Sequence, residues 1–186
     1  MTQTVVVSAG TYHLPFDRLV TWMEPWVARH PAVHVVMQHG PSKPLAGAEN
    51  HTVLPYPRLM ALCGAADAIV LQGGAGGVMD MRSLARIPIV VPRIPVGNEV
   101  VDDHQLIFTN KAAELGVIHR AVTKEQLWQH LDAAINGTLL TRINVALATP
   151  GVANIARLLT VLPAAGSPGT RSRRLLRSAM GAVRRR

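Results

Sequence analysis

Short runs rich in Val and Ile alternate along the chain with longer segments in which apolar residues recur every three or four positions. A short run that is apolar throughout is typical of a strand buried on both faces, whereas the longer repeat is typical of a helix with one buried side. The pattern predicts strands at Thr4–Ser8, Val33–Gln38, Thr52–Leu54, Ala68–Leu71, Pro88–Pro92 and, from a weaker run, Val117–His119.

Helical periodicity fills the intervals between these strands. In "PFDRLVTWMEPWVARH", for example, Leu19, Met23 and Trp26 fall on one face of a helix. Similar patterns predict helices within residues 57–66, 78–86, 103–116 and 123–135. Because strands alternate with helices and the strands are apolar on both faces, the sequence predicts an α/β fold with a doubly wound, Rossmann-like parallel sheet.

The length of 186 residues, with 48% hydrophobic positions, suffices for one substantial core but not for two full domains. We expect one domain over residues 1–163 and a tail over residues 164–186, because "LPAAGSPGT" is typical of a boundary. The apolar runs are shorter than the roughly 20 residues that cross a bilayer, and no secretory signal pattern is visible. Cys63 is the single cysteine, which favours a cytoplasmic protein.

Most of the net charge of +8 belongs to the tail. Seven of the 19 basic residues lie within residues 164–186, which leaves 12 basic against 11 acidic residues in the rest. A helix there would gather Leu176, Met180 and Val183 on one side. Arg173, Arg174 and Arg177 would lie largely off that stripe. This pattern predicts docking on an anionic membrane surface. A disordered solubilising tail is the alternative, and nucleic acid is the least favoured partner.

Loops that follow strands are the candidate functional positions, because ligands of an open parallel sheet bind beyond the carboxyl ends of its strands. The first such loop places Gly10 and Thr11 directly after a strand, with His13 in the same loop. The second places His39 and Gly40 after the next strand. We expect both loops to face the same cleft.

A glycine-rich loop follows the strand at Ala68–Leu71 and consists of Gly73, Gly74, Ala75, Gly76 and Gly77. Glycines let the backbone approach a ligand, and the N-terminus of the following helix favours a phosphate. Asp80, about one turn into that helix, would repel a phosphate but suits the paired hydroxyls of a ribose. The alternative is a tight turn with an acidic residue favoured by the helix dipole, and such loops alone are weak signals.

A polar cluster opens the helix predicted within residues 103–116. One Asp would suffice as a cap, yet Asp103, His104 and Gln105 together offer acceptors, an imidazole and an amide. That mixture suits a ligand rich in hydroxyl groups. A capped surface helix is the alternative.

Several of these segments in combination resemble the nucleotide-sugar-binding domain of family-28 GT-B glycosyltransferases. The resemblance covers roughly residues 5–135, and it is carried by "GTYHLPFDRLV", "VMQHGPSKP", "GGAGGVMDMRSLARIPIVVPR" and "NEVVDDHQLIFTNKAAELG". "PFDRLV" together with "VPR", a spacer and "VDDHQ" is more specific than any single loop. The likeness is greatest to small bacterial exopolysaccharide glycosyltransferase subunits.

The resemblance implies a role for each loop. Gly10, Thr11 and the glycine-rich loop would flank the diphosphate of a UDP-sugar, and Asp80 would hold the ribose. The cluster at the head of the helix would hold the sugar hydroxyls, while backbone groups around Leu54 to Leu59 would hold the uracil. No metal or other cofactor is implied, because the sequence lacks an Asp-x-Asp pair.

The sequence departs from the family pattern near the phosphates. Gln72 stands where a histidine is expected, Ala75 replaces a proline and Gly77 a threonine. Tyr12 and Leu14 likewise replace an acidic residue and a histidine. These departures remove polar contacts, so a non-catalytic nucleotide-sugar-binding regulatory module is the alternative function.

As a member of this family the chain would be the donor-binding subunit of a two-chain, inverting hexosyltransferase. Backbone N–H groups would stabilise the leaving diphosphate, and His13 is the candidate general base, with a structural hydrogen bond as its alternative role. A GT-B active site lies between two Rossmann-like domains, whereas this sequence predicts a single domain of that kind. We therefore expect a membrane-anchored partner that binds a lipid-linked acceptor, at the inner face of the plasma membrane.

Overall fold

The computed structural model of the protein describes residues 2–143. It contains a parallel sheet in the order β3-β2-β1-β4-β5-β6. The strands are β1 (Thr4–Ser8), β2 (His34–Gln38), β3 (Glu49–His51), β4 (Ala68–Gln72), β5 (Ile89–Val91) and β6 (His119–Arg120). The helices are α1 (Asp17–Arg29), α2 (Tyr56–Ala65), α3 (Ala75–Ser83), α4 (His104–Glu114) and α5 (Lys124–Ile135).

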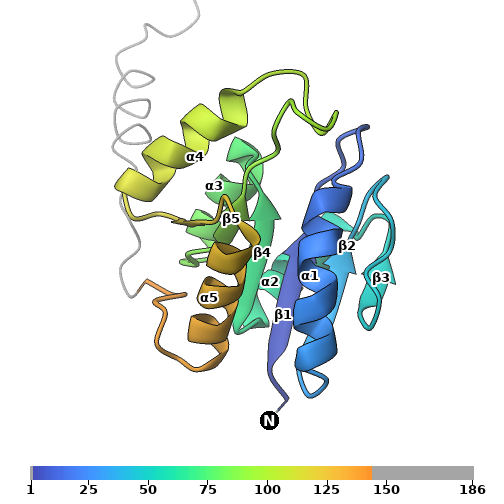
Figure 1. The fold of residues 1–186 in the computed structure, drawn as a ribbon. Helices are drawn as coiled ribbons and strands as arrows, with labels where there is room; N and C mark the ends of the chain where they lie inside the picture. Colours follow the sequence, from blue (N-terminus) through green and yellow to red (C-terminus); the bar gives the residue numbers. More distant parts are fainter. Residues whose placement is uncertain (1, 144–186) are drawn as a thin grey trace, which may run out of the picture. The chain divides into compact units, whose positions relative to one another are not determined.

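Helices cover both faces of this sheet (Figure 1). Consecutive residues of a strand point to opposite faces, so Val5 and Val7 belong to one core cluster and Val6 to the other. The first cluster includes Trp26 of α1 and Leu127 of α5, whereas the second includes residues of α2, α3 and α4. The predicted doubly wound α/β fold is confirmed.

The prediction of a strand at Thr52–Leu54 was wrong. The third strand covers Glu49–His51, whose register the side chain of Asn50 supports by bonding to backbone groups of Leu45 and Ala48. The backbone N–H of Leu54 instead donates to a side chain of β2, as described below. The last strand begins at His119 rather than at Val117, and α3 begins three residues before the predicted range.

One short turn before β4 bonds to both ends of the described chain. Asp67 accepts a hydrogen bond from the backbone N–H of Thr4 at 2.7 Å, and Arg142 donates to the carbonyl of Ala66 at 3.4 Å. The buried Arg86 donates to the carbonyl of Asp67 at 3.3 Å. Burial, together with the neighbouring positive charge of Arg142, lowers the pKa of Arg86 to about 10. This turn lies at the amino edge of the sheet.

The predicted boundary at residues 163–164 and the predicted basic tail lie outside the described residues. Within residues 2–143, no helix combines the length and the apolar character needed to cross a membrane.

Candidate functional site

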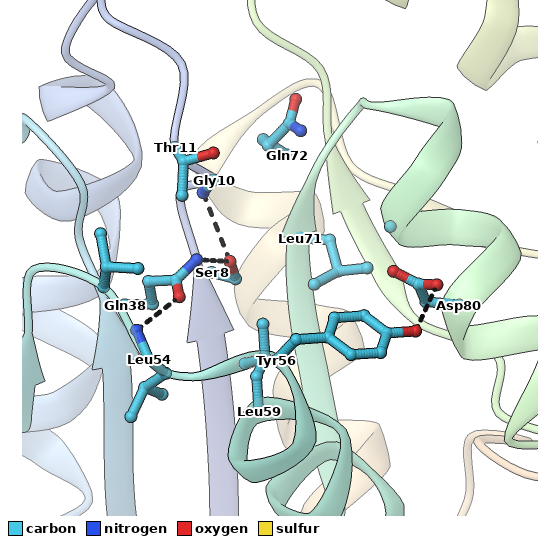
Figure 2. Close-up of a pocket in the computed structure, with 12 residues that line it drawn as sticks. Ser8, Gly10, Thr11, Gln38, Leu54, Tyr56, Leu59, Leu71, Gln72 and Asp80 are labelled. Atoms are coloured by element: carbon cyan, nitrogen blue, oxygen red, sulfur yellow. Dashed lines mark hydrogen bonds between the residues drawn. The ribbon is translucent and has the colours of Figure 1, made fainter.

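A cavity of about 320 Å³ opens at the carboxyl ends of β1, β2 and β4 (Figure 2). The strand order reverses between β1 and β4, and such a reversal is the usual ligand position in a doubly wound sheet. The cavity is lined by Ser8, Gly10, Thr11, Gln38, Val53, Leu54, Tyr56, Leu59, Leu71, Gln72, Gly77 and Asp80. The lining thus combines apolar side chains with a small number of polar groups, as binding sites for small molecules do.

The floor of the cavity contains a chain of hydrogen bonds between β1, β2 and the segment after β3 (Figure 2). The backbone N–H of Leu54 donates to Gln38 Oε1 at 2.9 Å, and Gln38 Nε2 donates to Ser8 Oγ at 3.1 Å. The backbone N–H of Gly10 donates to the same hydroxyl oxygen at 3.3 Å. Ser8 and Gln38 are buried, so these bonds hold the floor in one arrangement. Sequence reasoning missed both side chains.

The glycine-rich loop is shorter than the sequence predicted. Gly74 is the N-cap residue of α3, so Ala75, Gly76 and Gly77 form the first turn of the helix instead of a loop before it. Backbone N–H groups of a first helical turn have no partner within the helix, which makes this turn suited to an anion. Gly77 lines the cavity.

Packing also requires glycine in this loop. A Cβ atom at Gly73 would lie 2.9 Å from Gln105 Oε1 and 2.9 Å from Thr109 Cγ2, both on α4. A Cβ atom at Gly74 would contact the end of the Gln72 side chain, which would have to move. The loop therefore owes part of its composition to the close approach of α4 and of the Gln72 side chain.

Gln72 presents a free amide at the rim of the cavity. Its Oε1 atom is buried and has no hydrogen-bond partner among the residues that the structure describes. Buried polar atoms without partners are rare in folded proteins, and a bound ligand is one way to satisfy them.

Among the described residues, Asp80 is the one acidic side chain that lines the cavity. It lies in the second turn of α3, and its Oδ1 accepts a hydrogen bond from the phenol of Tyr56 at 2.9 Å (Figure 2). This hydrogen bond is the main reason why the pKa of Tyr56 is raised above its ordinary value. Tyr56 belongs to α2 and was not identified from the sequence, because no local pattern pairs it with Asp80.

The cluster at the head of α4 does not act as one group. Gln105 is buried, its Oε1 accepts a hydrogen bond from the backbone N–H of Arg93 at 3.0 Å, and it packs against Gly73. Asp103 and His104 are exposed and lie outside the cavity lining. Asp103 is the N-cap residue of α4 but makes no side-chain cap bond, and the carboxylate of Asp102 bonds to His104 instead.

The loop after β1 brings Gly10 and Thr11 to the cavity, whereas His39 and Gly40 of the loop after β2 are not among its lining residues. Gly10 adopts φ of +79°, a backbone conformation that favours glycine. His13 is exposed, and its ring lies 4.3 Å from that of Tyr12 between centroids. Within residues 2–143, no hydrogen bond orients the imidazole.

Arg93 at the end of β5 holds this loop in place, and sequence analysis assigned it no role. Its fully buried guanidinium donates to the carbonyl of Ala9 at 2.9 Å and to that of Leu14 at 2.8 Å. It also donates to the carbonyl of Glu99, whose carboxylate forms an ion pair with Arg18 at 2.8 Å. Glu99 is buried, so the site rests on an internal polar network.

No group of three or more His, Cys, Asp or Glu side chains within residues 2–143 is arranged to hold a metal ion.

Comparison with known proteins identifies the family. Residues 4–150 match the model of the glycosyltransferase family 28 C-terminal domain. No curated protein sequence matches the chain, whereas 40 chains of solved structures resemble it.

Three of these structures illustrate the likeness. The glycotransferase of kitacinnamycin is 21% identical, with a TM-score of 0.53 over 82% of this chain and 36% of that one. The solution structure of ALG13 is 17% identical, with a TM-score of 0.55 over 82% of this chain and 94% of that one. The calicheamicin glycosyltransferase CalG4 is 17% identical, with a TM-score of 0.53 over 72% and 34%.

These structural similarities establish a shared fold, that of one GT-B half-domain. The chain spans about a third of the length of two of these glycosyltransferases. The family match itself covers most of the 186 residues. The chain therefore belongs to the glycosyltransferase family 28 C-terminal domain family.

Proposed function

We propose that this protein is the donor-binding subunit of an inverting glycosyltransferase, which transfers a hexosyl group from a UDP-sugar to a lipid-linked acceptor. One observation carries the proposal. The cavity at the reversal of strand order combines apolar walls, the first turn of α3 and the Asp80 carboxylate. These are the groups that a base, a diphosphate and a ribose require, respectively.

The uracil occupies the part of the cavity formed by the segment after β3, near Leu54 and Leu59. The ribose hydroxyls bond to Asp80 and replace the phenol of Tyr56 there. The diphosphate lies between Gly10 and the first turn of α3. Preorganised N–H groups at a helix N-terminus stabilise the charge that grows on a leaving diphosphate.

The transferred sugar extends past the glycine-rich loop toward the head of α4. Gln105 and Thr109 are side chains of that helix that already approach the loop, at Gly73. Asp103 and His104 are exposed, and in this proposal they bond to sugar hydroxyls that lie outside the cavity. His13 acts as the general base, and its free imidazole is available to accept the proton of an acceptor hydroxyl.

A second chain supplies the acceptor site. Support comes from the described residues, which form a single GT-B half-domain with a fold similar to that of the ALG13 structure. We propose that the partner is membrane-anchored, that the complex acts in exopolysaccharide synthesis at the inner face of the plasma membrane, and that the two chains are active only together.

A non-catalytic nucleotide-sugar-binding module is the second candidate. Gln72 favours it, because an amide that replaces an imidazole cannot exchange a proton near the phosphates. Both candidates bind the same donor. Product formation with the partner subunit present distinguishes them.

Isothermal calorimetry with the full chain tests the binding site. UDP should bind without added metal and equally well in EDTA, because the proposed phosphate site consists of backbone groups. Asp80→Asn should weaken UDP by about 1–3 kcal/mol, as expected for hydrogen bonds lost at a buried site. Glu114→Gln, on the exposed face of α4, is the control and should leave the affinity unchanged. A wild-type chain that does not bind UDP would overturn the proposal.

A further inference from the structure

The orientation of one buried amide in the cavity floor is fixed by the backbone. Gln38 Oε1 lies 2.9 Å from the backbone nitrogen of Leu54. A backbone N–H can only donate, so the oxygen of the amide must face Leu54 and its NH₂ group must face the other way. Gln38 is 4% exposed and bonds on both sides, which leaves the side chain no second arrangement with both bonds intact.

This orientation determines what the hydroxyl of Ser8 can do. Gln38 Nε2 lies 3.1 Å from Ser8 Oγ and the backbone nitrogen of Gly10 lies 3.3 Å from it. Both neighbours are donors, so the Ser8 oxygen accepts two hydrogen bonds and its own hydrogen has no acceptor in either of them. Ser8 lines the cavity, and the direction that remains for the hydrogen is toward the cavity.

We infer that Ser8 donates a hydrogen bond to an acceptor oxygen of the bound nucleotide, and that Gln38 is a positioning residue that fixes this direction. The inference rests on the proposed function and adds a specificity element to it. A hydroxyl normally serves as donor or acceptor, but here the relay from Leu54 through Gln38 leaves only donation. The floor of the cavity therefore selects an oxygen without hydrogen, such as a base carbonyl or a phosphate oxygen, and disfavours an N–H group.

Two substitutions distinguish the presence of the Ser8 hydroxyl from the direction in which its hydrogen points. Ser8→Ala removes the donor. Gln38→Glu retains the shape of the side chain, but an ionised carboxylate accepts from both Leu54 and Ser8, so the hydrogen of Ser8 turns away from the cavity. Each variant should bind UDP roughly 10-fold more weakly than the wild type, the effect of about one lost hydrogen bond. The same loss should appear for uridine when the acceptor oxygen belongs to the nucleoside. The double variant should be no weaker than the weaker single variant, because both changes remove the same contact.

The pH dependence of Gln38→Glu provides a readout that a merely structural role does not give. When the introduced carboxyl group is protonated, it can donate to Ser8 again and restore the original direction. Uridine affinity of this variant should therefore recover toward that of the wild type as the pH falls. Uridine is uncharged, so repulsion of phosphate does not contribute. Asp80 and Tyr56, the other titratable groups of the cavity, are present in both proteins, and comparison with the wild type at each pH removes their effect.

The outcomes separate this inference from the proposed function. A wild-type chain that binds neither uridine nor UDP contradicts the proposed function. If the wild type binds but Ser8→Ala and Gln38→Glu bind equally well, only the inference fails. Affinity losses that add up in the double variant, or a Gln38→Glu variant whose affinity does not recover at low pH, would contradict the positioning role of Gln38. Equal losses for uridine and UDP place the acceptor oxygen on the nucleoside, whereas a loss confined to UDP places it on a phosphate. Circular dichroism confirms that each variant is folded, and the pH recovery of Gln38→Glu decides even if Ser8→Ala does not fold.

Discussion

The phenol of Tyr56 donates a hydrogen bond to the carboxylate of Asp80, the group that we propose binds the ribose. Tyr56 is 59% exposed, so its hydrogen bond to Asp80 competes with water and is readily exchanged for a ligand hydroxyl. The residue can thus hold Asp80 in position when the cavity is empty and release it when a nucleotide binds. This exchange follows from two side chains of different helices, α2 and α3.

The Tyr56–Asp80 hydrogen bond makes a spectroscopic prediction. A carboxylate acceptor stabilises the protonated phenol, so Asp80→Asn should lower the pKa of Tyr56 toward its ordinary value. Titration of the tyrosinate absorbance measures the change. The chain has two tyrosines, and Tyr56→Phe identifies the contribution of Tyr12. An unchanged titration in Asp80→Asn would show that the pair does not form in solution.

Two glycines of the same segment should respond oppositely to alanine. Gly73→Ala should lower the free energy of unfolding by about 1–3 kcal/mol, because the added methyl group meets the buried side chain of Thr109. Gly76→Ala should raise it by up to about 1 kcal/mol, since Gly76 lies in α3 with no atom within 4 Å of the added carbon. Urea denaturation compares the two variants. Equal effects would mean that α4 does not pack on the loop as described.

At the scale of elements, Arg93 joins β5 to the loops that surround the cavity. Arg93→Met keeps the length of the side chain but leaves several buried carbonyl groups without a donor. The free energy of unfolding should fall by about 3–5 kcal/mol. Arg58→Met is the matched control, because Arg58 is exposed and bonds to the exposed Glu49, so it should change stability by less than about 0.5 kcal/mol. Similar losses in both variants would contradict the bracing role of Arg93.

The elements themselves were largely predictable, because hydrophobic periodicity reports which face of an element is buried. The error at Thr52–Leu54 arose because a short apolar run also occurs where a chain enters a cavity wall, and Leu54 does so. The glycines of the site could be placed after β4, because the buried apolar run that predicts this strand ends just before them. The Ser8–Gln38 relay and the Tyr56–Asp80 pair could not be predicted, because the partners are distant in sequence and lie on different strands or helices that only the folded chain brings together.

At the scale of the whole molecule, the basic segment 164–186 gives a prediction for the intact chain. Each arginine near an anionic leaflet contributes about 1 kcal/mol, so seven of them should retain the protein on such vesicles. The full chain should sediment with anionic liposomes but not with neutral ones, and high salt should release it. A chain that ends at Pro163 is the control and should stay in the supernatant. If both chains behave alike, the segment has no role at the membrane.

The position of the turn before β4 indicates where a tether or a second protein can be attached to this domain. It bonds to Thr4 near one end of the described chain and to Arg142 near the other, at the sheet edge opposite the cavity. A tether, a solid support or a fused protein attached ahead of β1, at that edge, would lie at the opposite end of the strands from the cavity.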